Sequence, residues 1–158
     1  MSHIVLFVCT GNVCRSPMAT ALFNARARGA GEDHLYVARS AGTWALENQP
    51  AAGHAITTMA ERGIDLTAHR GQTITRGLIE QAAVVIVMTR SHRDALVSEF
   101  SPVRTKIHLM SELIDRTFDI ADPYGSTLSE YQDCAASLEN LINSGYEKIK
   151  SWISSPAH

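Results

Sequence analysis

The residue types that could do chemistry are gathered in one short segment near the start of the chain, where Cys9 and Arg15 enclose five residues. A cysteine thiolate is a strong nucleophile, and an arginine guanidinium can bind two phosphate oxygens at once, which lysine cannot do. The segment consists of Cys9, Thr10, Gly11, Asn12, Val13, Cys14, Arg15 and Ser16. It predicts a site where a thiolate attacks a bound phosphate group while a serine hydroxyl donates to the sulfur.

The residues around this segment predict a loop between a strand and a helix. Residues 4–8 are apolar and rich in β-branched side chains, which is typical of a strand buried on both faces. Ser16 and Pro17 form a helix start, with serine at the cap and proline at the first helical position. Main-chain N–H groups at such a junction bind anions, and their positive field favours a thiolate. Gly11 and Asn12 are the residues that best tolerate the left-handed backbone of a tight loop.

A second segment, Asp122-Pro123-Tyr124, could supply the proton that a departing oxygen needs. Each segment alone has an ordinary interpretation, because Asp-Pro is a common turn and a cysteine that ends a strand is usually a core residue. The order of strand, Cys9, Arg15 and helix start, followed by Asp122, favours chemistry over both alternatives.

The rest of the chain alternates strands with helices. Further strands are predicted at residues 34–41, 82–88 and 106–109, and further helices at 50–62, 75–81, 91–100 (with Ser91 at its cap) and 128–153. Because the strands are apolar throughout, they predict an α/β fold of three layers, a parallel sheet with helices on both faces. We expect one domain over residues 1–158, with a frayed end at 154–158.

Charge and composition predict a soluble cytoplasmic protein. The net charge of −2 gives no basic field for nucleic acid or for an anionic membrane. The apolar stretch at residues 4–9 is too short for a signal peptide or a membrane span. The three cysteines are an odd number without zinc-site spacing, which favours reduced thiols.

Four segments together resemble the low-molecular-weight protein tyrosine phosphatase family over nearly the whole chain. They are VLFVCTGNVCRSPMA at residues 5–19, SAGT at 40–43, GIDLTAHR at 63–70 and DPY at 122–124. The resemblance implies a four-stranded, flavodoxin-like sheet, no metal, no cofactor, and a phosphorylated protein as substrate. It implies that Cys9 is the nucleophile that becomes a phosphocysteine, Arg15 the phosphate clamp, and Asp122 the general acid and then the base that activates water.

The same resemblance assigns supporting residues. Asn12, Ser16, Ser40 and His69 match the set that holds the backbone of the loop. His69 would otherwise be interpreted as a surface histidine. Cys14 matches a second loop cysteine, which either forms a reversible disulfide with Cys9 or simply packs.

The residues expected to line a substrate slot above the phosphate are Val13, Trp44, Leu46 and Tyr124. Leu46 stands where tyrosine phosphatases of the family carry an aromatic, and Gly125 stands in place of a second tyrosine. Both features, with Trp44, resemble the branch of bacterial protein-arginine phosphatases. Aliphatic Val13 resembles the tyrosine-specific branch, since a flat aryl ring favours apolar walls. We therefore predict phosphotyrosine as substrate, with phosphoarginine as the alternative and a core or partner-contact role as the alternative for Trp44.

Three other functions share parts of this pattern. An arsenate reductase of this fold uses two further cysteines, and only Cys134, in the last predicted helix, remains. A cysteine phosphocarrier would not need Asp122 as an acid. A non-catalytic phosphate-binding module would not need Cys9, Arg15 and Asp122 together. The sequence favours an enzyme over all three.

Overall fold

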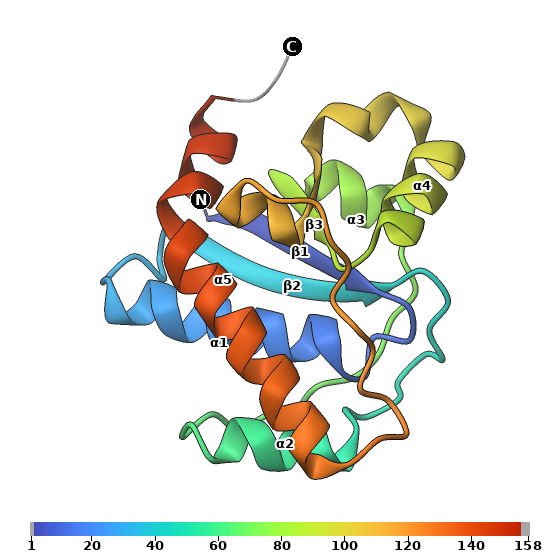
Figure 1. Ribbon diagram of the computed structural model, residues 1–158. Coiled ribbons are helices and arrows are strands. Elements are labelled where there is room, and N and C mark those ends of the chain that lie inside the picture. Colours follow the sequence, from blue (N-terminus) through green and yellow to red (C-terminus); the bar gives the residue numbers. More distant parts are fainter. Residues whose placement is uncertain (1, 156–158) are drawn as a thin grey trace.

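The computed structural model describes residues 2–155, and of residues 101–103 only the main chain. Its four strands are β1 (His3–Cys9), β2 (Tyr36–Gly42), β3 (Val84–Val87) and β4 (Ile107–Leu109). They form one parallel sheet in the order β2-β1-β3-β4, of which β2, β1 and β3 are labelled in Figure 1. The predicted α/β fold with a four-stranded parallel sheet is confirmed.

The sheet is buried on both faces because its central strands carry apolar side chains, at residues 4–9 of β1 and at all four positions of β3. In β1, Val5 and Phe7 face one hydrophobic cluster, while Leu6 and Val8 face the other. β3 alternates in the same way. The apolar run at residues 4–8 therefore contributes to two cores at once.

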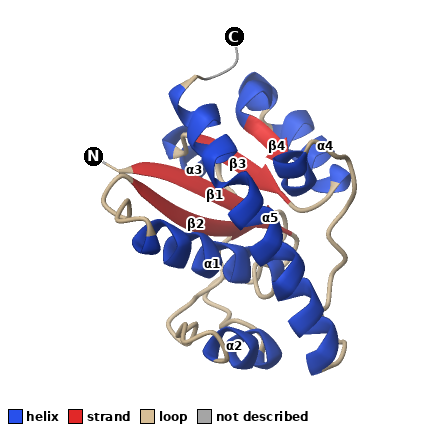
Figure 2. Cartoon of the chain, turned by 60° about the vertical axis from the view of Figure 1, so that its left-hand side comes forward, coloured by secondary structure: helices blue, strands red, loops and turns tan. Residues whose placement is uncertain are grey.

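Helices cover both faces of the sheet (Figure 2). On the Phe7 face lie α1 (Arg15–Gly29), α2 (Gly53–Ala60) and α5 (Leu128–Ser154). On the Leu6 face lie α3 (Arg76–Gln81) and α4 (Arg90–Glu99). Two 3₁₀ segments, Ser101–Lys106 and Met110–Ile114, flank β4. The three layers correspond to the predicted arrangement.

Three helix starts differ from the prediction. α1 begins at Arg15 after Cys14, so Ser16 is inside the helix and does not cap it. α4 is capped by Thr89, which accepts from the His92 amide at 3.1 Å, rather than by Ser91. α2 begins at Gly53 because residues 50–52 run extended beside the loop, where the Ala52 amide donates to the Val13 carbonyl at 2.9 Å.

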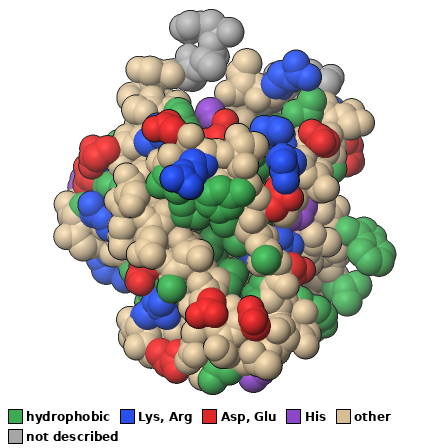
Figure 3. Space-filling model, in the orientation of Figure 1, with side chains coloured by type: hydrophobic (Ala, Val, Ile, Leu, Met, Phe, Trp, Pro, Cys, Tyr) green, Lys and Arg blue, Asp and Glu red, His purple; other side chains and the backbone are tan. Residues whose placement is uncertain are grey.

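Of the predicted frayed tail at residues 154–158, Ser154 is the last residue of α5 and Ser155 is its C-cap. The remainder of the predicted tail, residues 156–158, lies outside the described residues. Among residues 2–155, no helix combines the length and the apolar character needed to cross a membrane. Acidic and basic side chains are interspersed on the visible face (Figure 3), as the small net charge predicts.

The strand order creates a crevice between β1 and β3. The chain leaves β1 towards α1 on one face of the sheet and leaves β3 towards α4 on the other. In open α/β sheets, ligands bind at this switch point, beyond the carboxyl ends of the strands. The Cys9–Ser16 loop follows β1 and therefore lies at this crevice.

Candidate active site

The loop at residues 9–16 curls from the end of β1 into the start of α1. Its left-handed residue is Asn12, with φ 59°, whereas Gly11 does not have a positive φ. An asparagine tolerates this conformation better than most residues with a side chain. The sequence predicted left-handed backbone at Gly11 and Asn12, and the structure shows it at Asn12 but not at Gly11.

Asn12 and Ser16 form a hydrogen-bonded chain that ends at Cys9. The Asn12 side-chain amide donates to Ser16 Oγ at 2.9 Å, and Ser16 Oγ lies 2.9 Å from Cys9 Sγ. Because the serine oxygen already accepts from Asn12, its own proton can point at the sulfur, which lies closer than its other acceptor, the Ala41 carbonyl at 3.5 Å. This contact, rather than helix capping, is what the structure assigns to the Ser16 hydroxyl.

Two residues outside the loop hold Asn12 in place. His69 Nε2 lies 2.7 Å from the Asn12 carbonyl, and the Gln72 amide donates to Asn12 Oδ1 at 3.0 Å. Because a carbonyl only accepts, Nε2 must carry the His69 proton. Burial lowers the pKa of His69, which keeps the ring neutral in this role.

Within residues 2–155, the hydrogen-bonded link from Ser40 to the loop runs through Gln72, whose side chain donates to the Ser40 carbonyl at 3.0 Å. Gln72 thus connects β2 to the loop, a role that the sequence analysis did not foresee. Its position just after the 63–70 segment was the only signal that could have indicated it.

Two guanidinium nitrogens of Arg15 have partners, and the third has none among the described residues. The side chain is 4% exposed, and Nη1 donates to the Ile120 carbonyl at 2.9 Å. Nη2 lies 3.4 Å from Asp122 Oδ2, and the buried Nε has no partner among the described residues. A buried N–H donor without an acceptor is costly. The Nε–Nη2 edge therefore suits an anionic ligand that accepts two hydrogen bonds.

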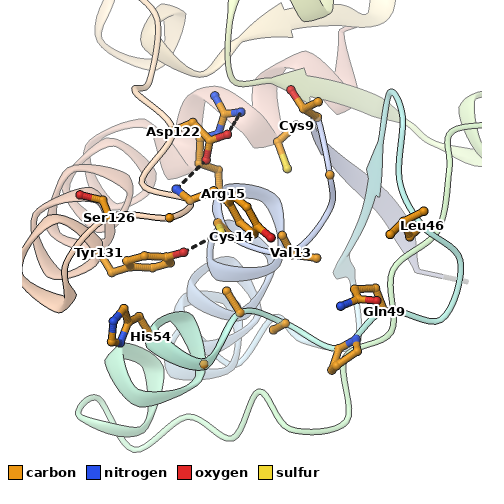
Figure 4. A pocket seen from close by; sticks show the side chains of 18 of the residues that line it. Cys9, Val13, Cys14, Arg15, Leu46, Gln49, His54, Asp122, Ser126 and Tyr131 are labelled. Carbon is orange, nitrogen blue, oxygen red and sulfur yellow. Dashed lines mark hydrogen bonds and ion pairs between the residues drawn. The ribbon is translucent and has the colours of Figure 1, made fainter.

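Asp122 differs from its neighbour Asp119 in what surrounds it. The Asp122 carboxylate is half-exposed, accepts from the Tyr124 amide at 3.0 Å and lies against Arg15 (Figure 4). Asp119 accepts from the main chain and side chain of Arg90 at 2.9 and 3.2 Å, and these bonds lower its pKa. Of the two carboxylates, Asp122 is the one placed at the loop, while Asp119 is held as an ion at the start of α4.

A cavity of about 780 Å³ opens above the loop. The predicted slot residues Trp44, Leu46 and Tyr124 line it but are 82%, 71% and 67% exposed, so they form its outer rim. Val13 lies deeper, beside Cys14, and in Figure 4 Tyr131 and His54 lie below Asp122 and across the cavity from Leu46. The exposure of Trp44 rules out a core role for it in this chain.

Comparison with known proteins decides the family. Residues 4–152 match the family model described as low molecular weight phosphotyrosine protein phosphatase. A protein named protein-arginine-phosphatase from Geobacillus stearothermophilus is 36% identical over 96% of this chain and 99% of its own length. A solved low molecular weight protein tyrosine phosphatase from T. tengcongensis is 40% identical, with a TM-score of 0.88 over 93% of this chain and 99% of that one. The chain belongs to the low-molecular-weight phosphatase family.

Family membership makes this chain a protein phosphatase, and its substrates are phosphorylated proteins, as the resemblance predicted. A further solved structure, a mutant arginine phosphatase with a phosphorylated active-site serine, is 34% identical, with a TM-score of 0.88 over 93% of this chain and 95% of that one. The predicted family, enzyme class and fold are confirmed by these matches.

The second loop cysteine of this phosphatase has a partner that the sequence did not reveal. Cys14 Sγ lies 3.3 Å from the Tyr131 hydroxyl, contributed by α5 (Figure 4). Burial raises the pKa of the Cys14 thiol to about 11, so it is protonated at neutral pH. Cys9, Cys14 and Cys134 are all free and buried.

In the part of the chain that the structure describes, no three His, Cys, Asp or Glu side chains are grouped so that they could hold a metal ion.

His92 is another residue that the sequence did not indicate. Its Nε2 lies 2.8 Å from Thr10 Oγ1, although the two residues are 82 positions apart.

Proposed function

We propose that this phosphatase hydrolyses phosphotyrosine on proteins through a phosphocysteine formed on Cys9. One observation carries the proposal. The buried Cys9 sulfur is held by Ser16 in a loop into which Arg15 projects a buried Nε that has no partner among the described residues. A bound phosphate group would satisfy that donor and lie in the anion-binding loop at the start of α1.

In the first step, the Cys9 thiolate attacks phosphorus, and the bond from phosphorus to the tyrosine oxygen breaks. Arg15 binds the equatorial oxygens, where charge spreads in the transition state. The tyrosine oxygen leaves with a proton from Asp122, because a phenol with a pKa near 10 departs poorly as an anion at neutral pH. A phosphate dianion on Arg15 would replace Asp122 as its partner, which leaves the carboxyl group free to face the tyrosine oxygen.

In the second step, water attacks the phosphocysteine, and the bond from phosphorus to sulfur breaks. The Asp122 carboxylate takes one proton from that water, so the residue returns to its acid form. Ser16 donates to the departing sulfur, for which its proton is already free. The solved relative with a phosphorylated active-site serine supports a covalent phosphoryl group at this position of the family.

The preference for phosphotyrosine rests on the walls of the cavity. Val13 gives the deep wall an aliphatic surface, and Trp44 and Tyr124 place aromatic rings at the rim. These surfaces suit a flat aryl ring. Phosphoserine has too short a side chain to bring its phosphorus from the rim down to Cys9.

Phosphoarginine is the second candidate substrate. A relative 36% identical over almost the whole chain is named protein-arginine-phosphatase. Trp44 and Gly125 resemble that branch, whereas Val13 lacks the hydroxyl from which a guanidinium would gain.

Turnover of matched phosphotyrosine, phosphoarginine and phosphoserine peptides by the purified protein tests this proposal. We expect the highest kcat/KM for phosphotyrosine and negligible turnover of phosphoserine. Val13→Thr should raise phosphoarginine turnover relative to phosphotyrosine by several-fold. A preference of the unaltered protein for phosphoarginine would replace the first substrate with the second.

The state of the cysteines bears on the cellular compartment of this protein. Three buried free thiols, one of them a proposed nucleophile, suit a reducing compartment, for which we propose the cytoplasm. The small net charge favours a protein substrate over nucleic acid or a membrane surface.

A further inference from the structure

Thr10, the residue that follows the proposed nucleophile in the chain, carries a hydroxyl group that the mechanism does not yet use. It follows Cys9, is exposed, and lines the active-site cavity together with Cys9 and Arg15. Its main-chain carbonyl accepts from the Trp44 amide at 3.0 Å, which fixes the residue in place. In the described chain, the hydrogen-bond partner of its hydroxyl is His92 Nε2, at 2.8 Å.

The surroundings of His92 determine which atom of this pair donates. His92 is 5% exposed in the first turn of α4, and its Nδ1 is buried without a partner among the described residues. Leaving an N–H unpaired there would cost more than leaving a lone pair, so the ring proton belongs on Nε2. Burial and the nearby Arg15 lower the pKa of His92 to about 4, against smaller opposing effects of Asp122 and Asp119, so the ring is neutral at pH 7.

Proton placement on Nε2 makes His92 the donor and the Thr10 oxygen the acceptor. The threonine proton is then directed away from the histidine, and within the described residues no group accepts it. Thr10 is one of the residues that line the cavity, so we expect its proton to be available to a molecule bound there.

The hydrogen bonds of the Thr10 hydroxyl resemble those of the Ser16 hydroxyl. There, the Asn12 amide donates to the serine oxygen and leaves the serine proton for Cys9 Sγ. Here, His92 Nε2 takes the place of the Asn12 amide and leaves the threonine proton for the cavity. Ser16 is fully buried beside Cys9 Sγ, whereas Thr10 is an exposed residue that lines the cavity.

We propose that Thr10 donates a hydrogen bond to the bound phosphoryl group and that His92 is the positioning residue that directs this proton. The pair bridges the switch point of the sheet, since Thr10 follows β1 and His92 lies in the helix after β3. The assignment rests on the proposed function, because it needs the Cys9–Ser16 loop to bind phosphate.

Calorimetric binding of inorganic phosphate, together with kcat/KM for a phosphotyrosine peptide, tests the role of Thr10. Thr10→Val removes the hydroxyl, and Thr10→Ser keeps it. We expect the valine variant to bind phosphate about tenfold more weakly, as for loss of one hydrogen bond to a charged group. The serine variant should stay within about twofold of the parent. Equal phosphate affinity of the valine variant and the parent would overturn the assignment.

A matched pair of amide variants tests His92. His92→Gln places an amide nitrogen near the position of Nε2, whereas His92→Asn places it near Nδ1. We expect near-parental phosphate binding for glutamine and a loss of about fivefold for asparagine. Adding His92→Asn to Thr10→Val should cause no further loss, because His92 acts through the threonine. Independent losses in the double variant would contradict this.

Nitrogen-15 NMR of the histidine ring tests the assignment without any substitution. We expect His92 to carry its proton on Nε2 at pH 7, and a proton on Nδ1 would overturn the proposal. Cys9→Ser separates this proposal from the proposed function. Full turnover by that variant would remove Cys9 as nucleophile, while the phosphate affinities would still decide the role of Thr10.

Discussion

The loop at residues 9–16 and the rim of the cavity above it are held in opposite ways. In the loop, Asn12 and Ser16 are fully buried, and hydrogen bonds from His69 and Gln72 fix the backbone that carries them. At the rim, Trp44, Leu46 and Tyr124 are 82%, 71% and 67% exposed.

This difference separates chemistry from selectivity. A nucleophile and its phosphate clamp must be held within a fraction of an ångström, which requires packing and satisfied hydrogen bonds. A rim that contacts varied protein surfaces needs apolar area more than precise placement. Changes in the loop should therefore reduce the rate constant, whereas changes at the rim should alter which substrate binds.

The largest effect is expected for Cys9→Ser. Serine keeps the shape of the side chain but lacks a readily ionised thiol, so turnover should fall by about 10⁴-fold or more. Inorganic phosphate should still bind, because Arg15 and the loop N–H groups remain. Steady-state kinetics and calorimetry measure the two quantities, and a variant that keeps most of its rate would exclude Cys9 as nucleophile.

Asp122→Asn should slow phosphotyrosine cleavage by about 10²–10⁴-fold, the usual contribution of general acid–base catalysis. The loss should shrink in single-turnover release of leaving groups that depart without a proton. Asp119→Asn is the matched control, because Asp119 is bound to Arg90 rather than to the loop. A loss that does not depend on leaving-group acidity would mean that Asp122 is not the acid.

Arg15→Lys should lower kcat/KM by about 10²–10³-fold. Lysine keeps the positive charge but cannot hold two equatorial oxygens with one planar group, nor fill the buried positions of both Nη1 and Nε. Steady-state kinetics on a phosphotyrosine peptide provide the measurement. Near-parental activity of the lysine variant would show that charge alone accounts for the role of Arg15.

Trp44→Ala tests the rim side of the comparison. Because Trp44 is 82% exposed, its removal should change the free energy of unfolding by no more than about 0.5 kcal/mol. The KM for a phosphotyrosine peptide should rise by about three- to tenfold, with kcat within about twofold of the parent. A collapse of kcat with unchanged KM would place Trp44 in the chemistry instead.

A change of pH tests the comparison through stability rather than through the rate, since the histidines behind the loop respond to it. Burial lowers the pKa of His92 to about 4, below its ordinary value near 6.5, so the unfolded chain binds the proton more readily. The resulting stability is fully present above about pH 6.5 and is lost as the pH falls towards 4, by about 2–3 kcal/mol. His69, also lowered by burial, adds to the loss. Urea midpoints from pH 8 to 4 measure it, and His92→Gln should flatten the curve.

Local patterns in the sequence were sufficient to predict the main features of the fold and of the Cys9–Ser16 loop. The apolar run at residues 4–8 predicts a strand buried on both faces because every side chain in it can enter a core. Cys9 and Arg15 lie in one continuous segment, so their spacing alone indicates a phosphate loop. Trp44 and Leu46 also appear in the predicted slot, but their exposure at the rim depends on how the 43–52 segment runs.

Contacts between distant residues were decided only by the tertiary structure. Ser16 before Pro17 is as good a helix cap as it is a partner for sulfur, and only the position of Asn12 settles which role it takes. Thr10 meets His92, and Cys14 meets Tyr131, across 82 and 117 positions. These pairs form because β1 lies next to β3 in the sheet and α5 crosses the face that carries α1. No local propensity encodes such neighbours, since they follow from the order in which strands and helices pack.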